Sequence, residues 1–324
     1  MLGEIIADLS NWMYTYLLVI LLVAAGLFFT IRNRFPQLRL LREAIRVVVE
    51  RPEKEGSVSS FQALMVSTAS RVGTGNIIGV SVAICMGGYG AVFWMWLIAV
   101  LGGASAFVES TLAQIYKKRG SDGSYGGPAY YIKQALKAPA LGGVFAAFLI
   151  LTYMGGFNAL ASFNLTDFVK AYVPSDNATL YIGIVVALLS AIVIFGGGKR
   201  ISKATQVIVP IMAIAYIGVA LLMIFFNIER FPSVIAGIFT GAFNFSSVAG
   251  GLFGAAVMNG IKRGLYSNEA GIGSAPNAAA SADVSHPVKQ GAGPDRFPCL
   301  SIIAASSARR QHSWCCVQVW ILRS

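Results

Sequence analysis

Residues 71–80 read RVGTGNIIGV, so three glycines, a threonine and an asparagine interrupt an apolar stretch. Such a segment suggests either a phosphate-binding loop or a break in a membrane helix. A dinucleotide fingerprint needs G-x-G-x-x-G between a strand and a helix. Gly73 and Gly75 fit that pattern, but Ile78 occupies the third glycine position and the lysine of a P-loop is missing. We therefore exclude phosphate binding.

A broken membrane helix accounts better for this stretch, because glycine loosens helical backbone. Backbone freed at membrane depth is tolerated only where it lines a cavity or is buried in protein. Transporters use such breaks to bind substrate carboxylates and sodium. Thr74 and Asn76 add side-chain oxygens, which hard cations prefer. From spacing alone, a packing seam with both side chains hydrogen-bonded to a neighbouring helix explains the stretch equally well.

A second apolar segment favours the binding site over the packing seam. Residues 239–264 read FTGAFNFSSVAGGLFGAAVMNGIKRG, and Gly250, Gly251 and Gly254 interrupt them near the middle. Paired glycine-broken spans in two halves of a chain indicate a site between inverted repeats. The second break falls five spans after the first. This is the spacing of a five-plus-five inverted repeat with one extra leading span.

The composition requires these elements to lie in a membrane. Hydrophobic residues make up 56% of the chain and charged residues 12%, against about 25% charged in soluble domains. The mean hydropathy is +0.68. A membrane span needs roughly 20 apolar residues, and we expect seven such segments, at 13–31, 61–87, 91–116, 141–166, 179–195, 204–226 and 233–260. The first segment has no basic region before it, so we expect it to stay as a span rather than be cleaved.

Lysine and arginine cluster in alternate connections, and this pattern predicts an orientation. The connection after the first span is the most basic, with Arg32, Arg34, Arg39, Arg42, Arg46, Arg51 and Lys54. We therefore place the amino terminus outside and residues 32–60 in the cytoplasm. The net charge of +11 is explained by these topology signals, and we expect no nucleic-acid partner.

Few ionisable groups fall inside the predicted spans. Arg71 and Glu109 do, and since charges at membrane depth are costly, we expect a structural ion pair between them. The polar segment 117–137 predicts a cytoplasmic loop with a short interfacial helix. The two histidines lie outside the spans, and Cys315 and Cys316 lack a zinc spacing. We expect no enzyme activity, no cofactor and no metal site other than sodium.

Four blocks of this sequence resemble the alanine/glycine:cation symporter family. These blocks are RVGTGNIIGV, GGYGAVFWMWLIAVLGGASAFVESTLAQIYKKR, GGPAYYIKQAL and SNEAGIGSAPNAAASA. The likeness extends from about residue 10 to residue 290. It implies an all-α polytopic membrane protein with a leucine-transporter-like inverted-repeat fold. It also implies sodium-coupled symport of alanine or glycine across the bacterial inner membrane, with a periplasmic amino terminus and the lipid bilayer as a partner. Proton coupling stays open as an alternative.

The resemblance also implies a set of site residues. Substrate would bind at Thr74, Gly75 and Asn76 of the first broken helix and at Gly250, Gly251 and Phe253 of the second. Backbone carbonyls of Val72 and Gly73 would bind sodium. In the third core span, relatives carry Gln and Asn where Ala161 and Phe163 align here. Asn158 or Asn164 could take their place.

The chain divides into four regions on this interpretation. Residues 1–60 hold the leading span and a basic loop, 61–227 a first five-helix repeat, and 228–290 the start of a second repeat. Residues 291–324 hold three of the four cysteines and no span, which indicates a frameshift or truncation near residue 291. We therefore expect an incomplete fold that transports poorly alone. The alternative function is an inactive fragment, or a membrane interaction protein whose partner supplies the missing half.

Overall fold

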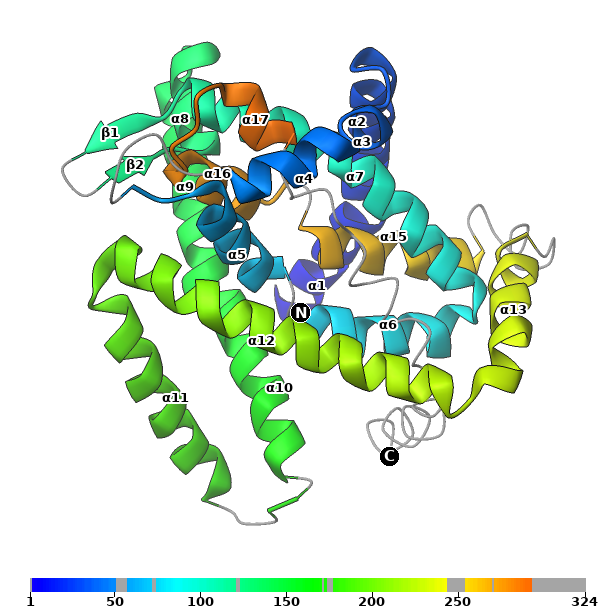
Figure 1. Ribbon diagram of the computed structural model, residues 1–324. Helices are drawn as coiled ribbons and strands as arrows, with labels where there is room; N and C mark the ends of the chain where they lie inside the picture. The colour runs from blue at the N-terminus through cyan, green and yellow to red at the C-terminus, as the bar shows by residue number, and fades with distance from the viewer. Residues whose placement is uncertain are drawn as a thin grey trace.

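The computed structural model of this chain describes residues 2–50, 57–71, 74–120, 123–170, 172–173, 177–243, 254–269 and 271–292. These residues form helices joined by short connections, with one small hairpin (Figure 1). Four continuous helices are long and apolar enough to cross a membrane: Gly3–Arg32, Gly90–Ile115, Pro139–Lys170 and Gly197–Phe225. The prediction of an all-α polytopic membrane protein is confirmed by this architecture.

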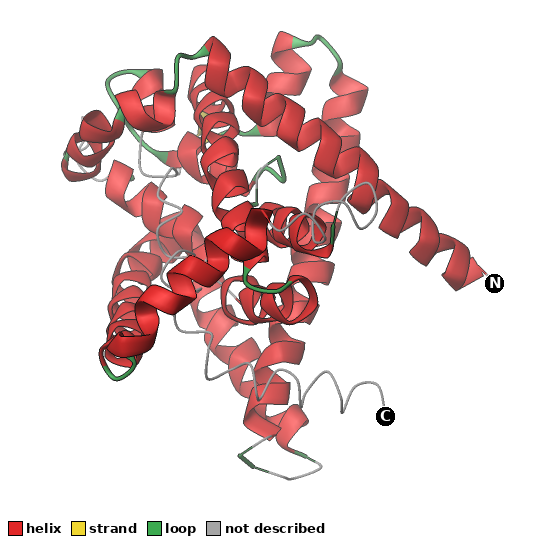
Figure 2. Cartoon of the chain, turned by 90° about the vertical axis from the view of Figure 1, so that its right-hand side faces the viewer, coloured by secondary structure: helices red, strands yellow, loops and turns green. Residues whose placement is uncertain are grey.

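The leading span is longer than the predicted 13–31. Helix α1 (Leu2–Trp12), the π-helical η1 (Met13–Leu18) and α2 (Val19–Arg32) follow one another without a break. No proline or charged cluster precedes Met13, so nothing in the sequence stops the helix there. The amino-terminal part of this helix projects from the rest of the molecule (Figure 2). After it, α3 (Pro36–Arg39) and α4 (Leu41–Val49) occupy the basic connection.

The predicted segment 61–87 consists of two helices. Helix α5 (Ser60–Arg71) ends and α6 (Thr74–Gly87) begins at the glycine-containing stretch, and the two run in different directions (Figure 1). Residues 72–73 between them lie outside the described residues. Helix α7 (Gly90–Ile115) follows after the turn at Gly88, whose φ of +72° suits glycine.

The polar loop 117–137 contains more structure than the sequence predicted. Strands β1 (Lys118–Gly120) and β2 (Gly123–Tyr125) form an antiparallel hairpin with Lys118 opposite Tyr125. The expected short helix is α8 (Pro128–Ala135). It packs on α9 (Pro139–Leu151) so closely that a Cβ added at Gly142 would lie 2.8 Å from the Ala129 carbonyl oxygen. Helix α8 therefore packs against another helix, and its interfacial position stays a prediction.

The third span contains a second π-helical segment. Helix α9 continues through η2 (Thr152–Phe157) into α10 (Asn158–Lys170), and α11 (Ala178–Ile194) runs beside α12 (Gly197–Phe225). Helix α12 begins earlier than the predicted 204, so Lys199, Arg200 and Lys203 lie in its first turns rather than in a connection. The outward faces of these helices are apolar; Phe148, Leu188 and Ile214 are all exposed. In a bilayer such side chains face lipid.

The last predicted segment is also divided. The short η3 (Ile228–Arg230) leads into α13 (Phe231–Phe243), and α15 (Ala255–Asn268) follows. The predicted second break, residues 250–251 and 253, lies between these helices and outside the described residues. Helices α16 (Ser274–Ser281) and α17 (Pro287–Ala292) complete the described chain.

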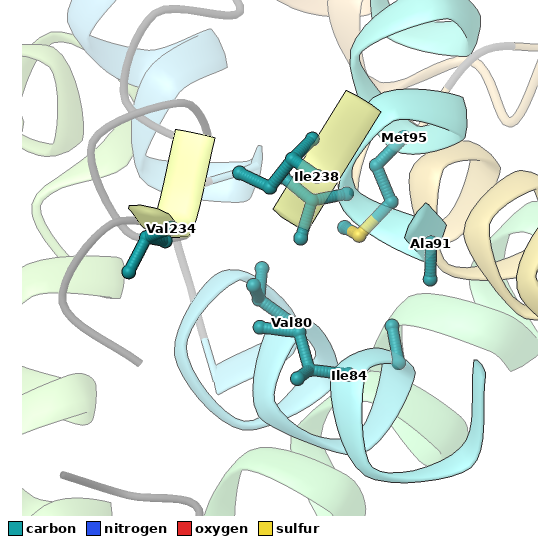
Figure 3. Close-up of a cluster of buried hydrophobic side chains, with 8 residues drawn as sticks. Val80, Ile84, Ala91, Met95, Val234 and Ile238 are labelled. Atoms are coloured by element: carbon teal, nitrogen blue, oxygen red, sulfur yellow. The ribbon is translucent and has the colours of Figure 1, made fainter. Parts of the chain in front are cut away.

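Helices α6, α7 and α13 enclose the main hydrophobic core. Val80 and Ile84 of α6 face Met95 of α7 and Ile238 of α13 (Figure 3). Glycines let the helix backbones approach. A Cβ on Gly90 would lie 2.3 Å from the Gly241 carbonyl carbon. Close approach through small residues is typical of helices packed in lipid.

The basic connections gather at one end of the molecule together with the last described residues (Figure 1). Val58 pairs with Ala282 in a parallel bridge. Lys289 Nζ lies 2.5 Å from Glu50 Oε1. Lys117 Nζ donates to the Ala282 carbonyl at 2.8 Å, just after the end of α16. Cations near a helix carboxyl end are favourable, so the Lys117 contact holds the end of α16 against the end of α7.

Candidate functional site

The predicted substrate residues lie at the junction of α5 and α6. Thr74, Gly75 and Asn76 form the first turn of α6, as a half-helix amino terminus requires, and their side chains are not described. The remaining predicted residues lie outside the described part of the chain; these are Val72, Gly73, Gly250, Gly251 and Phe253. Their roles stay predictions.

A cavity of about 260 Å³ lies at the carboxyl end of α5. Its walls come from the last turn of α5, from η2 and the start of α10, and from the end of α15. The lining residues are Ala69, Ser70, Arg71, Tyr153, Phe157, Asn158, Leu160, Ala161, Tyr266, Ser267 and Glu269. The cavity thus adjoins the helix break in sequence and has polar, charged and aromatic walls. Such a wall suits a small polar ligand.

Glu269 is the centre of a hydrogen-bond cluster in this wall. Its side chain is buried, with 7% of the residue exposed. Ser70 Oγ donates to Glu269 Oε2 at 2.9 Å, and the Tyr153 hydroxyl donates to the same oxygen at 3.2 Å. Ser274 Oγ is a third donor to Oε2. One carboxylate oxygen therefore joins α5, η2 and α16.

The backbone of Glu269 places its carboxylate in that position. Glu269 follows α15 directly and has a left-handed φ of +48°. Gly271 and Gly273 also have positive φ, and α16 begins at Ser274. A non-glycine residue in the left-handed region is uncommon, and such residues concentrate at functional sites. The tight turn brings the carboxylate back to the first residue of the next helix.

The π-helical η2 shapes the opposite wall. Isolated π segments within α-helices are frequent at functional sites. Tyr153 and Phe157 project from η2 with ring centroids 5.1 Å apart, and Phe157 lies 6.0 Å from the Tyr266 ring. These three rings connect the third span to the end of α15 and form an aromatic side to the cavity.

The third span contributes residues that the sequence analysis left undecided. Asn158 and Ala161 both line the cavity. Phe163 is 65% exposed and does not line it. Of the two proposed substitutes for the amide side chains of relatives, Asn158 is therefore the one at the cavity.

A larger cavity of about 540 Å³ adjoins the first. Ser70 and Tyr153 line both. The larger cavity extends past Ser274 to Ser124 of the hairpin and to Lys199 at the start of α12. The Glu269 cluster thus lies between the smaller cavity, which we call the inner cavity, and the larger cavity, which reaches the basic connections.

The two predicted membrane charges have different surroundings. Arg71 lines the inner cavity. Glu109 acts on Tyr131 of α8: burial raises the pKa of the Tyr131 hydroxyl, and the negative charge of Glu109 raises that pKa further. The Arg71–Glu109 ion pair stays a prediction. Among the described residues, His, Cys, Asp and Glu form no group of three that could hold a metal ion.

Sequence reasoning missed Glu269 and its three hydroxyl donors. The last predicted span ended at residue 260, so Glu269 lay beyond every predicted span and was not considered. The available signal was the turn sequence NEAGIGS, where one acid lies among glycines. Ser70 and Tyr153 carried no comparable signal, because they join Glu269 only through the tertiary fold.

Comparison with known proteins gives a consistent family. The model of the sodium:alanine symporter family matches residues 1–294. The amino-acid carrier protein AlsT of Bacillus subtilis is 50% identical over 282 residues, which are 87% of this chain and 60% of that protein. The probable sodium/glutamine symporter GlnT of Bacillus subtilis is 46% identical over 292 residues, 90% of this chain and 61% of that protein.

A third relative is similar over the same part of this chain. The sodium/alanine symporter AgcS of Methanococcus maripaludis is 39% identical over 295 residues, which cover 89% of this chain and 65% of that protein. The chain therefore spans between 60% and 65% of the length of these three relatives.

Proposed function

This chain belongs to the sodium:alanine symporter family, and we propose that its protein couples the inward movement of sodium to uptake of a small neutral amino acid. The observation that carries this proposal is the cavity at the junction of α5 and α6, in a chain of a symporter family. Alternating access around a site between inverted repeats would move the substrate. The chain would contribute a leucine-transporter-like first repeat and the start of the second.

The proposed substrate is alanine or glycine. An amino acid at neutral pH carries an ammonium and a carboxylate, and the cavity is lined by both Glu269 and Arg71. Its volume of about 260 Å³ corresponds to roughly nine water molecules in the liquid. A ligand of a few non-hydrogen atoms fits such a space together with an ion.

The broken helix would supply the remaining contacts. Backbone amides of Thr74, Gly75 and Asn76 at the start of α6 would face the substrate carboxylate, because the amino end of a helix favours negative charge. Gly250, Gly251 and Phe253 would contribute from the second break, and the carbonyls of Val72 and Gly73 would bind sodium. Each assignment comes from the family resemblance.

The proposed location is the bacterial inner membrane, with the amino terminus in the periplasm. The alternation of basic and basic-poor connections supports this orientation. So does the gathering of residues 32–50, 117–120 and 282–292 at one end of the molecule.

The four regions of the chain keep their proposed boundaries at 1–60, 61–227, 228–290 and 291–324. The family match ends at residue 294, close to the proposed start of the atypical tail. Alternating access needs both repeats, so the proposal concerns the protein with the full length found in relatives.

Equilibrium binding of alanine to the purified chain tests this function. Radiolabelled alanine should bind in sodium chloride and bind at least about tenfold more weakly in choline chloride, because binding of a coupling ion raises the affinity for the substrate. Binding that is equal in the two salts would contradict sodium coupling. Excess unlabelled glycine should compete, and excess unlabelled lysine should not.

A further inference from the structure

The two oxygens of the Glu269 carboxylate differ in their hydrogen bonding. The Ser70, Tyr153 and Ser274 hydroxyls all donate to Oε2. Among the described residues no hydrogen bond to Oε1 is recorded. Oε1 is absent from the set of fully buried, unpartnered polar atoms of the described residues, which means that it keeps some accessible surface. Glu269 also lines the inner cavity. Oε1 is therefore the oxygen that a ligand in this cavity can reach.

The three donors suit an ionised carboxylate. Each is a neutral hydroxyl that donates a hydrogen bond, and an ionised carboxylate only accepts them. They fix the side chain but bring no compensating charge. A buried carboxylate without an opposite charge is costly, and Arg71 is the cation that the described lining of the same cavity contains. The arrangement thus holds a negative charge at the edge of a space large enough for a ligand.

We propose that Oε1 of Glu269 binds a monovalent cation in the inner cavity, either the α-ammonium group of the substrate or the coupling sodium ion. Each of these cations carries one positive charge and is bound through oxygen atoms. This inference rests on the proposed function, since both cations belong to a sodium–amino-acid symporter. It assigns them a residue outside both predicted helix breaks.

The surrounding groups favour a monovalent over a divalent cation. Calcium takes several carboxylate and carbonyl oxygens, whereas Glu269 is the one acidic residue that lines this cavity among the described residues. Tyr153, Ser267 and Asn158 line it as well and offer neutral oxygens. Arg71 also lines the cavity, so a monovalent cation at Glu269 leaves less excess positive charge there than a divalent one.

A purely structural role for Glu269 makes a different prediction. If the carboxylate only fastens α5, η2 and α16, then its loss lowers stability without changing affinity in the protein that still folds. Glu269→Gln keeps the size and can still accept from the hydroxyls, but it removes the charge. Glu269→Asp keeps the charge and shortens the side chain. Glu229→Gln, in the exposed η3, is the matched control.

The test measures binding of ²²Na⁺ without amino acid, and binding of radiolabelled alanine at saturating sodium, to the purified chain. We expect Glu269→Gln to weaken one of the two at least about tenfold, Glu269→Asp to weaken it less, and Glu229→Gln to change neither. Loss of ²²Na⁺ binding identifies sodium as the cation. Loss of alanine binding with ²²Na⁺ binding intact identifies the ammonium.

A competition experiment checks the ammonium outcome. Propionate lacks the amino group of alanine, so the native chain should prefer alanine and Glu269→Gln should lose that preference. If Glu269→Gln does not fold, Glu269→Asp and Tyr153→Phe carry the test, and unchanged affinities in both would overturn the inference. Affinities unchanged in a folded Glu269→Gln would overturn it too. If neither the native chain nor a fusion of residues 1–290 to the carboxyl-terminal part of AgcS binds either ligand, then the proposed function itself fails.

Discussion

Ser70 donates a 2.9 Å hydrogen bond to Oε2 of Glu269, and so joins the last turn of α5 to the turn that follows α15. The two residues are 199 positions apart in the chain. The bond therefore connects the helix before the first predicted break to the helix after the second. If the breaks form one binding site, this contact is among those that must adjust when the site changes its access.

The hydroxyl cluster should contribute measurably to stability. Hydrogen bonds to charged groups are worth about 1.5–3 kcal/mol, so Ser274→Ala should lower the free energy of unfolding by about 2 kcal/mol. Titration of the detergent-solubilised protein with denaturing detergent measures this change. Thr166→Ala is the control, because the hydroxyl of the half-buried Thr166 donates to the Ser162 carbonyl of its own helix rather than to a charged group. A loss no larger for Ser274→Ala than for the control would contradict a structural contribution of the cluster.

The contact between α7 and α13 should tolerate no side chain at Gly90. A Cβ there would lie 2.3 Å from the Gly241 carbonyl carbon, and such overpacking costs about 1–3 kcal/mol. Gly90→Ala should therefore lower the unfolding temperature. Gly143→Ala in α9, where a Cβ meets nothing within 4 Å, should not. Equal effects of the two substitutions would show that the helices do not pack as described.

The inner cavity should be sensitive to added volume at Ala161 and not at Phe163. Ala161 lines the cavity, whereas Phe163 is 65% exposed. Ala161→Trp should therefore reduce alanine binding by at least about tenfold, and Phe163→Trp should leave it unchanged. Equilibrium binding of radiolabelled alanine distinguishes the two. Full binding by Ala161→Trp would place the substrate elsewhere.

Stability should fall at high pH through Tyr131. Burial raises the pKa of its hydroxyl above the ordinary value, and Glu109 raises it further. A group whose folded-state pKa is raised stabilises the fold fully below its unfolded pKa, near 10 for tyrosine, and this stabilisation is lost as pH rises toward the folded value. Thermal unfolding from pH 8 to 11.5 should show a decline that is smaller in Tyr131→Phe. The same slope in both proteins would remove Tyr131 as its cause.

The proposed orientation predicts from which side of the membrane an introduced cysteine can be labelled. With the four native cysteines replaced by alanine, Lys118→Cys in β1 should react with an impermeant maleimide only in inside-out vesicles. Asn177→Cys, which precedes α11, should react only in right-side-out vesicles. The opposite pattern would reverse the orientation without changing the fold.

The sequence was sufficient for the features that depend on local composition. Apolar length predicted the four long helices, which correspond to four of the seven predicted segments, and the glycines of 71–80 predicted the point where α5 ends and α6 begins. Helix ends were less predictable. Helix α12 starts at Gly197 rather than 204 because charged residues such as Lys199 remain good helix formers. A helix can thus continue beyond the apolar stretch that reveals it.

The site was only partly predictable, for a physical reason. Residues beside a glycine break can be recognised from their neighbours in the chain. Glu269 cannot, because its environment comes from Ser70 and Tyr153, which lie in two other helices. A single sequence does not show which distant hydroxyl groups reach one carboxylate. Hence the largest addition made by the structure is a charged group outside the predicted breaks.

Sodium-driven alanine uptake into proteoliposomes tests the central claim most directly. Residues 1–290 would be fused to the remaining carboxyl-terminal part of the sodium/alanine symporter AgcS, and AgcS alone would serve as the positive control. The account predicts that an inward sodium gradient drives accumulation of alanine by the fusion, that a sodium ionophore abolishes it, and that the 324-residue chain alone accumulates little. Absence of sodium-driven uptake by the fusion, while AgcS alone transports, would contradict the account.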